Sequence, residues 1–372
     1  MSLRIILSVE ALEPHLSGIG RYNWALASRM ASLSVIEDVR FWRSGHWIAD
    51  PAGLLDPDRP LPRDWRPRWW RNRSQRGFGR THLFHGPNYF LPDWAEGGVV
   101  TVHDLSVLRY PETHPADRIA HFERRFSQSL AIAGHVITDS DTVRREVIDM
   151  FALDPAQVTA IPLGVDAAFH PRDAAEIVPI LTRYDLTPNG YALCVSTVEP
   201  RKRIAQLLQA WSLLPPALRH RWPLMVTGGK GWLSEDIRAL MEQGQAQGWV
   251  RYLGFVPDED LPILYAGAGL FLYPSVYEGF GLPPVEAMAS GVPVLVANAS
   301  CLPEVTGGAA MLVEPDDVDG FARHITQALE DEAWRAQARA AGLAVAAKYD
   351  WDACVRDTVA LYGRLYNSKR SA

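Results

Sequence analysis

One glycine-rich stretch in the second half of the chain constrains the fold more than any other feature. It spans residues 277–291 and reads YEGFGLPPVEAMASG. An apolar run at 270–273 comes before it, and a second apolar run at 293–296 comes after it. Strand, turn, short helix and strand in this order form one unit of a parallel α/β sheet. Ligands of such sheets bind where the strands end, so we predict that this turn lines a binding site.

The residues inside the turn indicate the kind of ligand. Glu278 lies in the loop, and Glu286 lies in the opening turn of the helix. The backbone amides of Phe280, Gly281 and Leu282 are predicted to begin the helix, where amides lack intrahelical partners and favour phosphate. Carboxylates accept hydrogen bonds from hydroxyl groups, such as those of ribose. We expect an anionic, hydroxyl-rich ligand such as a nucleotide sugar, although an ordinary strand-turn-helix link would also explain a single glutamate.

The rest of the chain alternates strand-like and helical segments, which is the pattern of parallel α/β sheets. Its 372 residues suffice for two domains of this kind. We predict two Rossmann-like, doubly wound domains, residues 1–170 and 171–350, and a closing amphipathic helix within 351–372. Because ligands bind outside the carboxyl ends of the strands, the two domains are expected to face each other across a cleft.

Composition excludes several classes of protein. The net charge is −6 and 48% of the residues are hydrophobic, which is ordinary for a soluble globular protein and argues against general nucleic-acid binding. The three cysteines, Cys194, Cys301 and Cys354, are too far apart to suggest a metal site. No apolar run is long enough to cross a membrane, and the first residues read as a strand rather than a signal peptide. We expect a cytoplasmic protein that uses no metal and no cofactor.

A basic motif follows a predicted strand of the second domain. It reads EPRKR and spans residues 199–203. The start of a helix is a poor place for cations unless an anion is bound there. A diphosphate would supply that anion, since Arg201 can bind it through two hydrogen bonds and Lys202 as a point charge. The alternative is a solvated basic turn.

Glycines follow two further predicted strands. Gly18 and Gly20 come after the first strand and allow a phosphate or sugar to approach the backbone closely. They resemble part of a dinucleotide fingerprint, but Asn23 stands where the third glycine belongs, which argues against a dehydrogenase. Gly229 follows a strand of the second domain and would let a nucleotide approach in the same way. A tight turn would explain each of these glycines as well.

Residues 63–80 form an unusual segment that holds seven arginines against one acid. Aromatic residues are interleaved with the arginines, as in Arg68-Trp69-Trp70-Arg71. Such a segment suits peripheral contact with an anionic membrane, which attracts the cations and accommodates tryptophan at the level of the headgroups. It would also suit the diphosphate of a lipid-linked acceptor, and a solvated loop is the third possibility.

Part of the chain resembles a known family. A sequence motif of the second domain is similar to the E-x7-E signature of the retaining glycosyltransferases of group 1, family 4. The motif reads EGFGLPPVEAMASGVPVLVAN and is followed by LPEV. This resemblance implies the GT-B fold, in which two Rossmann-like domains face a cleft and the closing helix packs back on the first domain. It also implies transfer of a hexose from a nucleoside-diphosphate sugar to a sugar or a lipid-linked acceptor. Many members that read EPRK are mannosyltransferases of surface-polysaccharide synthesis, so the expected donor is GDP-mannose.

The resemblance assigns roles to single residues. His103, at the end of a strand in the first domain, matches a histidine that contacts the donor sugar near its 6-hydroxyl. Lys202 matches a lysine at the diphosphate. The usual arginine position holds Thr197, so Arg201 is expected to take its place. The expected catalytic residues are therefore His103, Arg201, Lys202 and Glu278.

Other residues are assigned to the donor or the acceptor. Glu286 is expected to hold the ribose, and the backbone at Phe255 to border the nucleotide base. The glycine loop of the first domain is expected to border the diphosphate. Asn88 and Tyr89 follow a strand of the first domain and are expected to face the acceptor, although a structural loop is an equal interpretation. A lone histidine at a strand end, such as His103, is likewise more often structural than catalytic.

Two other functions fit the same motifs. One is a nucleotide-sugar epimerase of the same fold, which would act without an acceptor. The other is a non-catalytic protein that binds nucleotide sugars. The intact set of His103, Lys202, Glu278 and Glu286 argues against this second possibility.

Overall fold

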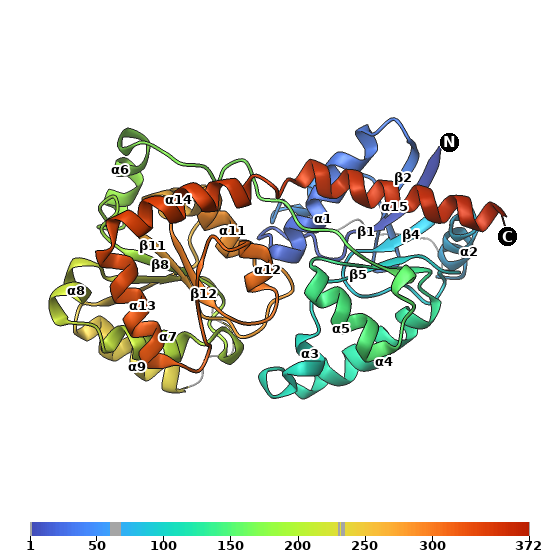
Figure 1. The fold of residues 1–372 in the computed structure, drawn as a ribbon. Helices are drawn as coiled ribbons and strands as arrows, with labels where there is room; N and C mark the ends of the chain where they lie inside the picture. Colours follow the sequence, from blue (N-terminus) through green and yellow to red (C-terminus); the bar gives the residue numbers. More distant parts are fainter. Residues whose placement is uncertain (1, 60–67, 230, 232–234, 372) are drawn as a thin grey trace. The chain divides into compact units, whose positions relative to one another are not determined.

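The computed structural model describes residues 2–59, 68–229, 231 and 235–371 and divides the chain into two compact units (Figure 1). The first unit holds Met1–Gly164 together with Asp350–Ala372, and the second holds Val165–Tyr349. The chain leaves the first unit a few residues before the division expected at 170. It returns to that unit with the closing helix α15 (Trp351–Ser371).

The first unit is built on a seven-stranded sheet in the order β3-β2-β1-β4-β5-β6-β7. All neighbouring strands are parallel except β3, which returns antiparallel to β2 and was not indicated by the sequence. The strands are β1 (Leu3–Ser8), β2 (Ile36–Arg43), β3 (His46–Ile48), β4 (Leu83–Gly86), β5 (Val99–Val102), β6 (His135–Thr138) and β7 (Val158–Ala160). Every residue of β4, β5 and β6 is buried, as expected for parallel strands that are covered on both faces.

Helices connect these strands. They are α1 (Gly18–Arg29), α2 (Arg68–Gly79), α3 (Ser106–Arg109), α4 (Ala116–Ile132) and α5 (Asp141–Phe151), with 3-10 turns η1 (Met30–Ser32), η2 (Pro51–Leu54), η3 (Pro111–Thr113) and η4 (Pro155–Gln157). The closing helix α15 packs on the same unit. Nε of Arg29 on α1 lies 2.8 Å from a carboxylate oxygen of Asp352, and the hydroxyl of Tyr362 lies 2.5 Å from Nδ1 of the buried His85.

The second unit has a six-stranded, all-parallel sheet in the order β10-β9-β8-β11-β12-β13. Its strands are β8 (Ala192–Val195), β9 (Leu224–Thr227), β10 (Val250–Gly254), β11 (Leu270–Tyr273), β12 (Val294–Ala297) and β13 (Met311–Val313). Its helices are α6 (Ala174–Arg183), α7 (Ile204–Ser212), α8 (Pro216–Arg221), α9 (Glu235–Ala246), α10 (Leu261–Gly267), α11 (Leu282–Ala289), α12 (Leu302–Thr306), α13 (Val318–Glu330) and α14 (Glu332–Ala346), and η5 (Pro200–Lys202) is a 3-10 turn.

The order of strands reverses direction once in each sheet. In the first sheet the chain builds outward from β1 to β3 and then restarts on the other side at β4. In the second sheet it builds outward from β8 to β10 and restarts at β11. The loops that leave the two strands at such a reversal diverge, and the crevice between them is where open α/β sheets bind ligands. The loops after β1, β4, β8 and β11 therefore border these two crevices.

Among the residues that the structure describes, no helix is both long enough and apolar enough to cross a bilayer.

Close packing at the start of α15 yields a stability prediction. A Cβ added to Gly164 would lie 2.2 Å from the backbone nitrogen of Trp351, which cannot move without displacing the helix. Gly164→Ala should therefore lower the free energy of unfolding by about 1–3 kcal/mol. Gly363 lies within α15 with nothing within 4 Å of an added Cβ, so Gly363→Ala should stabilise the helix by about 1 kcal/mol. Thermal unfolding of both variants would check this, and equal midpoints would contradict it.

Candidate functional site

A cluster of charged side chains lies at the reversal point of the second sheet. Lys202, in the loop after β8, forms an ion pair with Oε1 of Glu278, in the loop after β11. The hydroxyl of Tyr273, the last residue of β11, lies 3.1 Å from Nζ of Lys202 and donates to the same Oε1 at 2.9 Å. All three side chains are buried. The two loops that flank the crevice are thus joined by a salt bridge.

Arg201 extends the cluster on the other side. Its Nη2 lies 2.7 Å from Oε1 of Glu199, and its Nη1 lies 3.8 Å from Oε2 of Glu278. Nη1 also donates to the backbone carbonyl of Tyr277. Both Glu199 and Arg201 are buried, so the described cluster of Glu199, Arg201, Lys202 and Glu278 balances two cations with two carboxylates.

Local backbone geometry places these cations. Pro200, Arg201 and Lys202 form the 3-10 turn η5, and Arg203 then adopts a left-handed conformation with φ of 52° before α7 begins. The basic motif therefore precedes the helix instead of opening it, because a left-handed residue breaks the helical path. The amide of Val276 donates to the carbonyl of Arg201 at 3.2 Å and ties η5 to the loop after β11.

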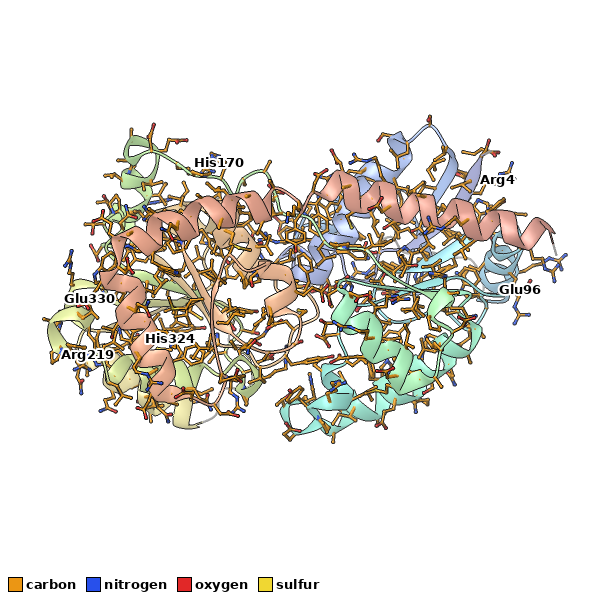
Figure 2. All side chains as sticks on the ribbon, viewed as in Figure 1. Arg4, Glu96, His170, Arg219, His324 and Glu330 are labelled. Carbon is orange, nitrogen blue, oxygen red and sulfur yellow. The ribbon has the colours of Figure 1, made fainter. Side chains whose placement is uncertain are left out.

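The electrostatics of the cluster favour an ionised Glu278. Burial alone would raise the pKa of this carboxyl, but the charges of Lys202 and Arg201 outweigh burial, and the pKa is lowered from its ordinary value of 4.5. The ion pair that Arg4 (labelled in Figure 2) makes with Glu37 is exposed to solvent, which screens it, so it contributes little to stability. Breaking a buried pair by removing one partner costs more, about 3–5 kcal/mol.

The glycine-rich turn has the predicted form. Gly281 has φ of 91°, a left-handed conformation that favours glycine, and it caps α11 directly before Leu282. Glu286 is buried, but it lies beyond the first turn of α11 and not in the opening turn where the sequence placed it, because the helix already begins at Leu282. The ring of Phe280 is buried edge-on against Tyr349 at 5.1 Å, so only the backbone of Phe280 is left to meet a ligand.

A third loop supports this turn. The hydroxyl of Ser300, after β12, donates to the carbonyl of Glu278 at 2.7 Å and accepts from its amide at 3.2 Å. Sγ of Cys301 lies 3.2 Å from the same carbonyl. Sequence reasoning missed Glu199 and Tyr273 as well as these two residues, although all four lie at or just beyond the carboxyl ends of strands.

Two more residues of the second unit were predicted to border the nucleotide sugar, Gly229 and Phe255. Both follow strands at the same edge of the sheet. Gly228 and Gly229 follow β9, and a Cβ on Gly228 would lie 2.1 Å from the carbonyl oxygen of Ser196, so this loop presses against the loop after β8. The amide of Val198 donates to the carbonyl of Gly229 at 3.2 Å. Phe255 follows β10, two strands away from β8, and 56% of its surface is exposed.

In the first unit, the predicted residues gather around His103, which follows β5. The ring of Tyr22, on α1, packs edge-on against His103 at 5.3 Å, and the ring of Tyr89 does so at 5.9 Å. Gly18 and Gly20 begin α1, with the Ser17 hydroxyl accepting from the amide of Gly20 at 3.2 Å. The glycine loop thus serves as the cap of the helix that carries Tyr22.

Both ring nitrogens of His103 are engaged within the first unit. Nδ1 lies 2.7 Å from Oδ2 of Asp139, and Nε2 lies 2.8 Å from the carbonyl oxygen of Pro87. A contact between this ring and the donor sugar stays a prediction, and it would require the ring to leave one of these partners. Asn88 lies next to Pro87 and is half-buried.

Comparison with known proteins establishes the family. Residues 186–344 match the family described as "Glycosyl transferases group 1", and residues 16–169 match "Glycosyltransferase Family 4". The chain is 40% identical to O-antigen chain mannosyltransferase B of Escherichia coli, over 97% of this chain and 99% of that protein. The chain belongs to the group 1, family 4 glycosyltransferases.

Other similarities agree with this assignment. A serotype-specific mannosyltransferase of Escherichia coli, WbdA, is 32% identical over 73% of this chain and 34% of that protein. The crystal structure of WaaG, a glycosyltransferase involved in lipopolysaccharide biosynthesis, superimposes with a TM-score of 0.74 at 16% identity, over 96% of this chain and 99% of that one. The two Rossmann-like units of this glycosyltransferase are thus those of the GT-B fold, as predicted.

Two predictions about the site fall partly outside the structure. The side chains of Arg68, Trp69, Trp70 and Arg71 lie outside the described part of the chain, as do residues 60–67 altogether. In the described remainder of α2, the Gln75 amide donates to the carbonyl of Gly45 at 2.7 Å.

Within the ranges that the structure covers, no group of three His, Cys, Asp or Glu side chains is arranged to hold a metal ion.

The buried pair of this glycosyltransferase makes stability depend on pH. Lys202→Met leaves Glu278 buried with Arg201 at 3.8 Å, and should lower the free energy of unfolding by about 3 kcal/mol at pH 7.5. The lowered pKa of wild-type Glu278 means that its pair stabilises above the ordinary value of 4.5 and weakens as the pH falls below it. In the variant, Lys202 no longer offsets the effect of burial, so Glu278 takes up a proton at a higher pH than in the wild type. The difference in unfolding free energy between the variant and the wild type should therefore shrink as the pH falls from 7.5 to 5. Urea unfolding at both pH values measures this.

Arg203→Met is the matched control. Arg203 is the next cation along the chain, but its partner Asp316, at 3.0 Å, is largely exposed. Its loss should cost no more than about 1 kcal/mol and should show little pH dependence over this range. Equal losses in the two variants, or a Lys202→Met deficit that does not change with pH, would contradict the assignment.

Proposed function

We propose that this glycosyltransferase is a retaining mannosyltransferase that transfers mannose from GDP-mannose to a saccharide or lipid-linked oligosaccharide in surface-polysaccharide synthesis. The observation that carries the proposal is the buried cluster of Arg201, Lys202 and Glu278 beside the glycine-capped helix α11. The name of the mannosyltransferase with 40% identity over nearly the whole chain supports the choice of sugar and pathway.

The cluster suggests how the donor would be bound. The two cations are paired with Glu199 and Glu278, so an incoming diphosphate would replace carboxylates as their partner. Lys202 would pass from Glu278 to the phosphate, and Arg201 would bind it through two hydrogen bonds. The carboxylate of Glu278 would then be available to accept hydrogen bonds from the sugar hydroxyls, while Glu286 would hold the ribose. One exchange of partners would couple recognition of the diphosphate to recognition of the sugar.

The same cluster would assist bond breaking. Negative charge grows on the diphosphate as the bond to the sugar breaks, and Arg201, Lys202 and the amides that begin α11 would stabilise it. This arrangement needs no metal or other cofactor to neutralise the leaving group. Glu278 has a lowered pKa, so it is suited to accept hydrogen bonds and not to donate a proton. For retention, we propose that the acceptor attacks from the side of the leaving phosphate, which takes up its proton.

Transfer assays test the donor and the site together. We expect the purified protein to transfer mannose from GDP-mannose to a saccharide acceptor, with the anomeric configuration of the donor retained in the product as seen by NMR. Lys202→Ala and Glu286→Ala should each reduce turnover by at least about 100-fold, since each removes a charged contact to the donor. Arg203→Ala, which removes the neighbouring half-buried cation whose partner Asp316 is exposed, is the control and should retain turnover.

The outcomes separate the alternatives. Turnover confined to a UDP-sugar would refute the choice of donor, and near wild-type activity of Lys202→Ala would refute the site. Conversion of the nucleotide sugar in the absence of any acceptor would favour an epimerase. Binding of GDP-mannose without conversion under any condition would favour a non-catalytic binding protein.

We also propose that residues 63–80 bind the lipid-linked acceptor at an anionic membrane surface. The support is the excess of arginine among interleaved aromatic residues, and Arg73 and Arg76 are exposed on the described part of α2. A version with these arginines replaced by serine should bind anionic vesicles more weakly, by about 1 kcal/mol for each cation that lies near the surface. Sedimentation with vesicles of phosphatidylglycerol measures this, and unchanged binding would rule the proposal out.

A further inference from the structure

A buried series of hydrogen bonds crosses the first unit from the closing helix to α1. The hydroxyl of Tyr362, on α15, lies 2.5 Å from Nδ1 of His85, on β4. Nε2 of His85 lies 2.8 Å from the hydroxyl of Thr101, on β5, which in turn lies 3.0 Å from the hydroxyl of Tyr22, on α1. All four residues are fully buried. They form a core relay that connects two helices through two strands of the sheet.

The spacing of residues along α15 explains why a tyrosine of this helix reaches the sheet. Cys354, Thr358 and Tyr362 follow one another at intervals of four residues, so they lie on one face of the helix. All three are buried. The hydroxyl of Thr358 donates to the backbone carbonyl of Cys354 at 2.8 Å and is thus satisfied within the helix. The hydroxyl of Tyr362 instead reaches His85, and the two rings pack edge-on at 5.6 Å.

The chemistry of these groups gives the relay a direction. Burial lowers the pKa of His85 to about 3, with a smaller contribution from His103, so the imidazole of His85 is neutral and carries one N–H. Burial raises the pKa of Tyr362, so its phenol keeps the proton. Because a phenol is more acidic than an aliphatic hydroxyl, Tyr362 donates to Nδ1, and the proton of His85 lies on Nε2, which donates to Thr101.

Tyr22 connects the relay to residues that are predicted to meet the donor. Its ring packs edge-on against the ring of His103 at 5.3 Å, and it lies one turn beyond Gly18 in α1. The side-chain amide of the adjacent Asn23 donates to the carbonyl of Ser8 at 2.9 Å, which ties the start of α1 to the end of β1. The bond from Tyr22 to the relay therefore helps to fix both the ring that supports His103 and the helix that follows the glycine loop.

A second contact joins α1 to α15 near the other end of α1. Nε of Arg29 lies 2.8 Å from Oδ1 of Asp352, but 36% and 64% of these two side chains are exposed. Solvent screens an exposed pair of this kind, whereas the hydrogen bonds of the buried relay act where water does not compete with them. The relay is therefore expected to control the start of α1 more strongly than the exposed ion pair does.

We propose that His85 and Tyr362 are positioning residues of the transfer reaction, which act through Thr101 to hold Tyr22 against His103 and the glycine loop in place for the donor. A neutral ring whose two nitrogens are both engaged with protein groups does not serve as a general base. Its part is to link the closing helix to the donor side of the first unit. The effect on transfer rests on the proposed function, whereas the relay and its direction do not.

Tyr362→Phe tests the proposal, because it removes one oxygen and keeps the ring. In protein labelled with 15N-histidine, NMR at pH 7.5 should show wild-type His85 neutral, with its proton on Nε2. In the variant, the ring signals of His103 should shift, although the hydroxyl is lost at the far end of the relay. The kcat/KM for GDP-mannose should fall about tenfold, with the KM for acceptor changed less than about threefold.

Matched variants separate positioning from a general loss of stability. Tyr191→Phe makes the same chemical change in the second unit, where the buried hydroxyl donates to the carbonyl of Leu264 at 2.5 Å. Arg29→Met removes the exposed contact between α1 and α15. Both should keep the wild-type kcat/KM and the wild-type signals of His103. Thr101→Val should act like Tyr362→Phe, whereas Thr101→Ser, which keeps the hydroxyl, should retain most of the activity.

The outcomes decide each part separately. A charged His85 in the wild type, or a proton on its Nδ1, would overturn the proposal and needs no variant to observe. Unchanged His103 signals and unchanged kcat/KM in Tyr362→Phe would overturn it as well, and so would an equal loss of activity in Tyr191→Phe. If the wild type transferred mannose to no acceptor, the proposed function would fail, while the NMR results would still decide whether the relay positions His103.

Discussion

The buried ion pair between Lys202 and Glu278 is the interaction on which the site in the second unit depends. Each charge would be costly to bury alone, so each requires the other to stay in place. Because the two residues leave β8 and β11, the pair joins the two loops at the point where the order of strands reverses. Tyr273, Arg201 and the carbonyl of Tyr277 complete the arrangement, which is satisfied before any ligand arrives.

The first unit solves a similar problem with different residues. There, the buried pair is His103 with Asp139, again at the carboxyl ends of neighbouring parallel strands. Both pairs are overall neutral, so the protein can bury them, and both lie beside loops that follow the strands. They differ in what a ligand could change. We propose that a diphosphate replaces Glu278 as the partner of Lys202, since it offers the same charge, whereas His103 lies between two acceptors of its own unit, Asp139 and the carbonyl of Pro87.

Sequence reasoning succeeded where the signal is local. The glycine-rich turn between Glu278 and Glu286 has the predicted strand, turn and helix, and it led to the family that the comparisons show. It was less successful with partners. It placed Arg201 and Lys202 at an anion but did not predict that Glu199 and Glu278 already supply one, and it did not single out Asp139. Lys202 and Glu278 are 76 positions apart and His103 and Asp139 are 36 apart, and no periodicity records such distances.

The sequence by itself determined the class of fold, the family and the kinds of side chain at the strand ends, because apolar periodicity and glycine placement act over a few neighbouring residues. Only the tertiary structure decided which of these side chains meet. Parallel strands bring their carboxyl ends to one edge, and the strand orders β8-β11 and β4-β5-β6 select the neighbours there. Burial then requires each charge at that edge to find a partner, and this requirement converts a row of polar residues into two specific ion pairs.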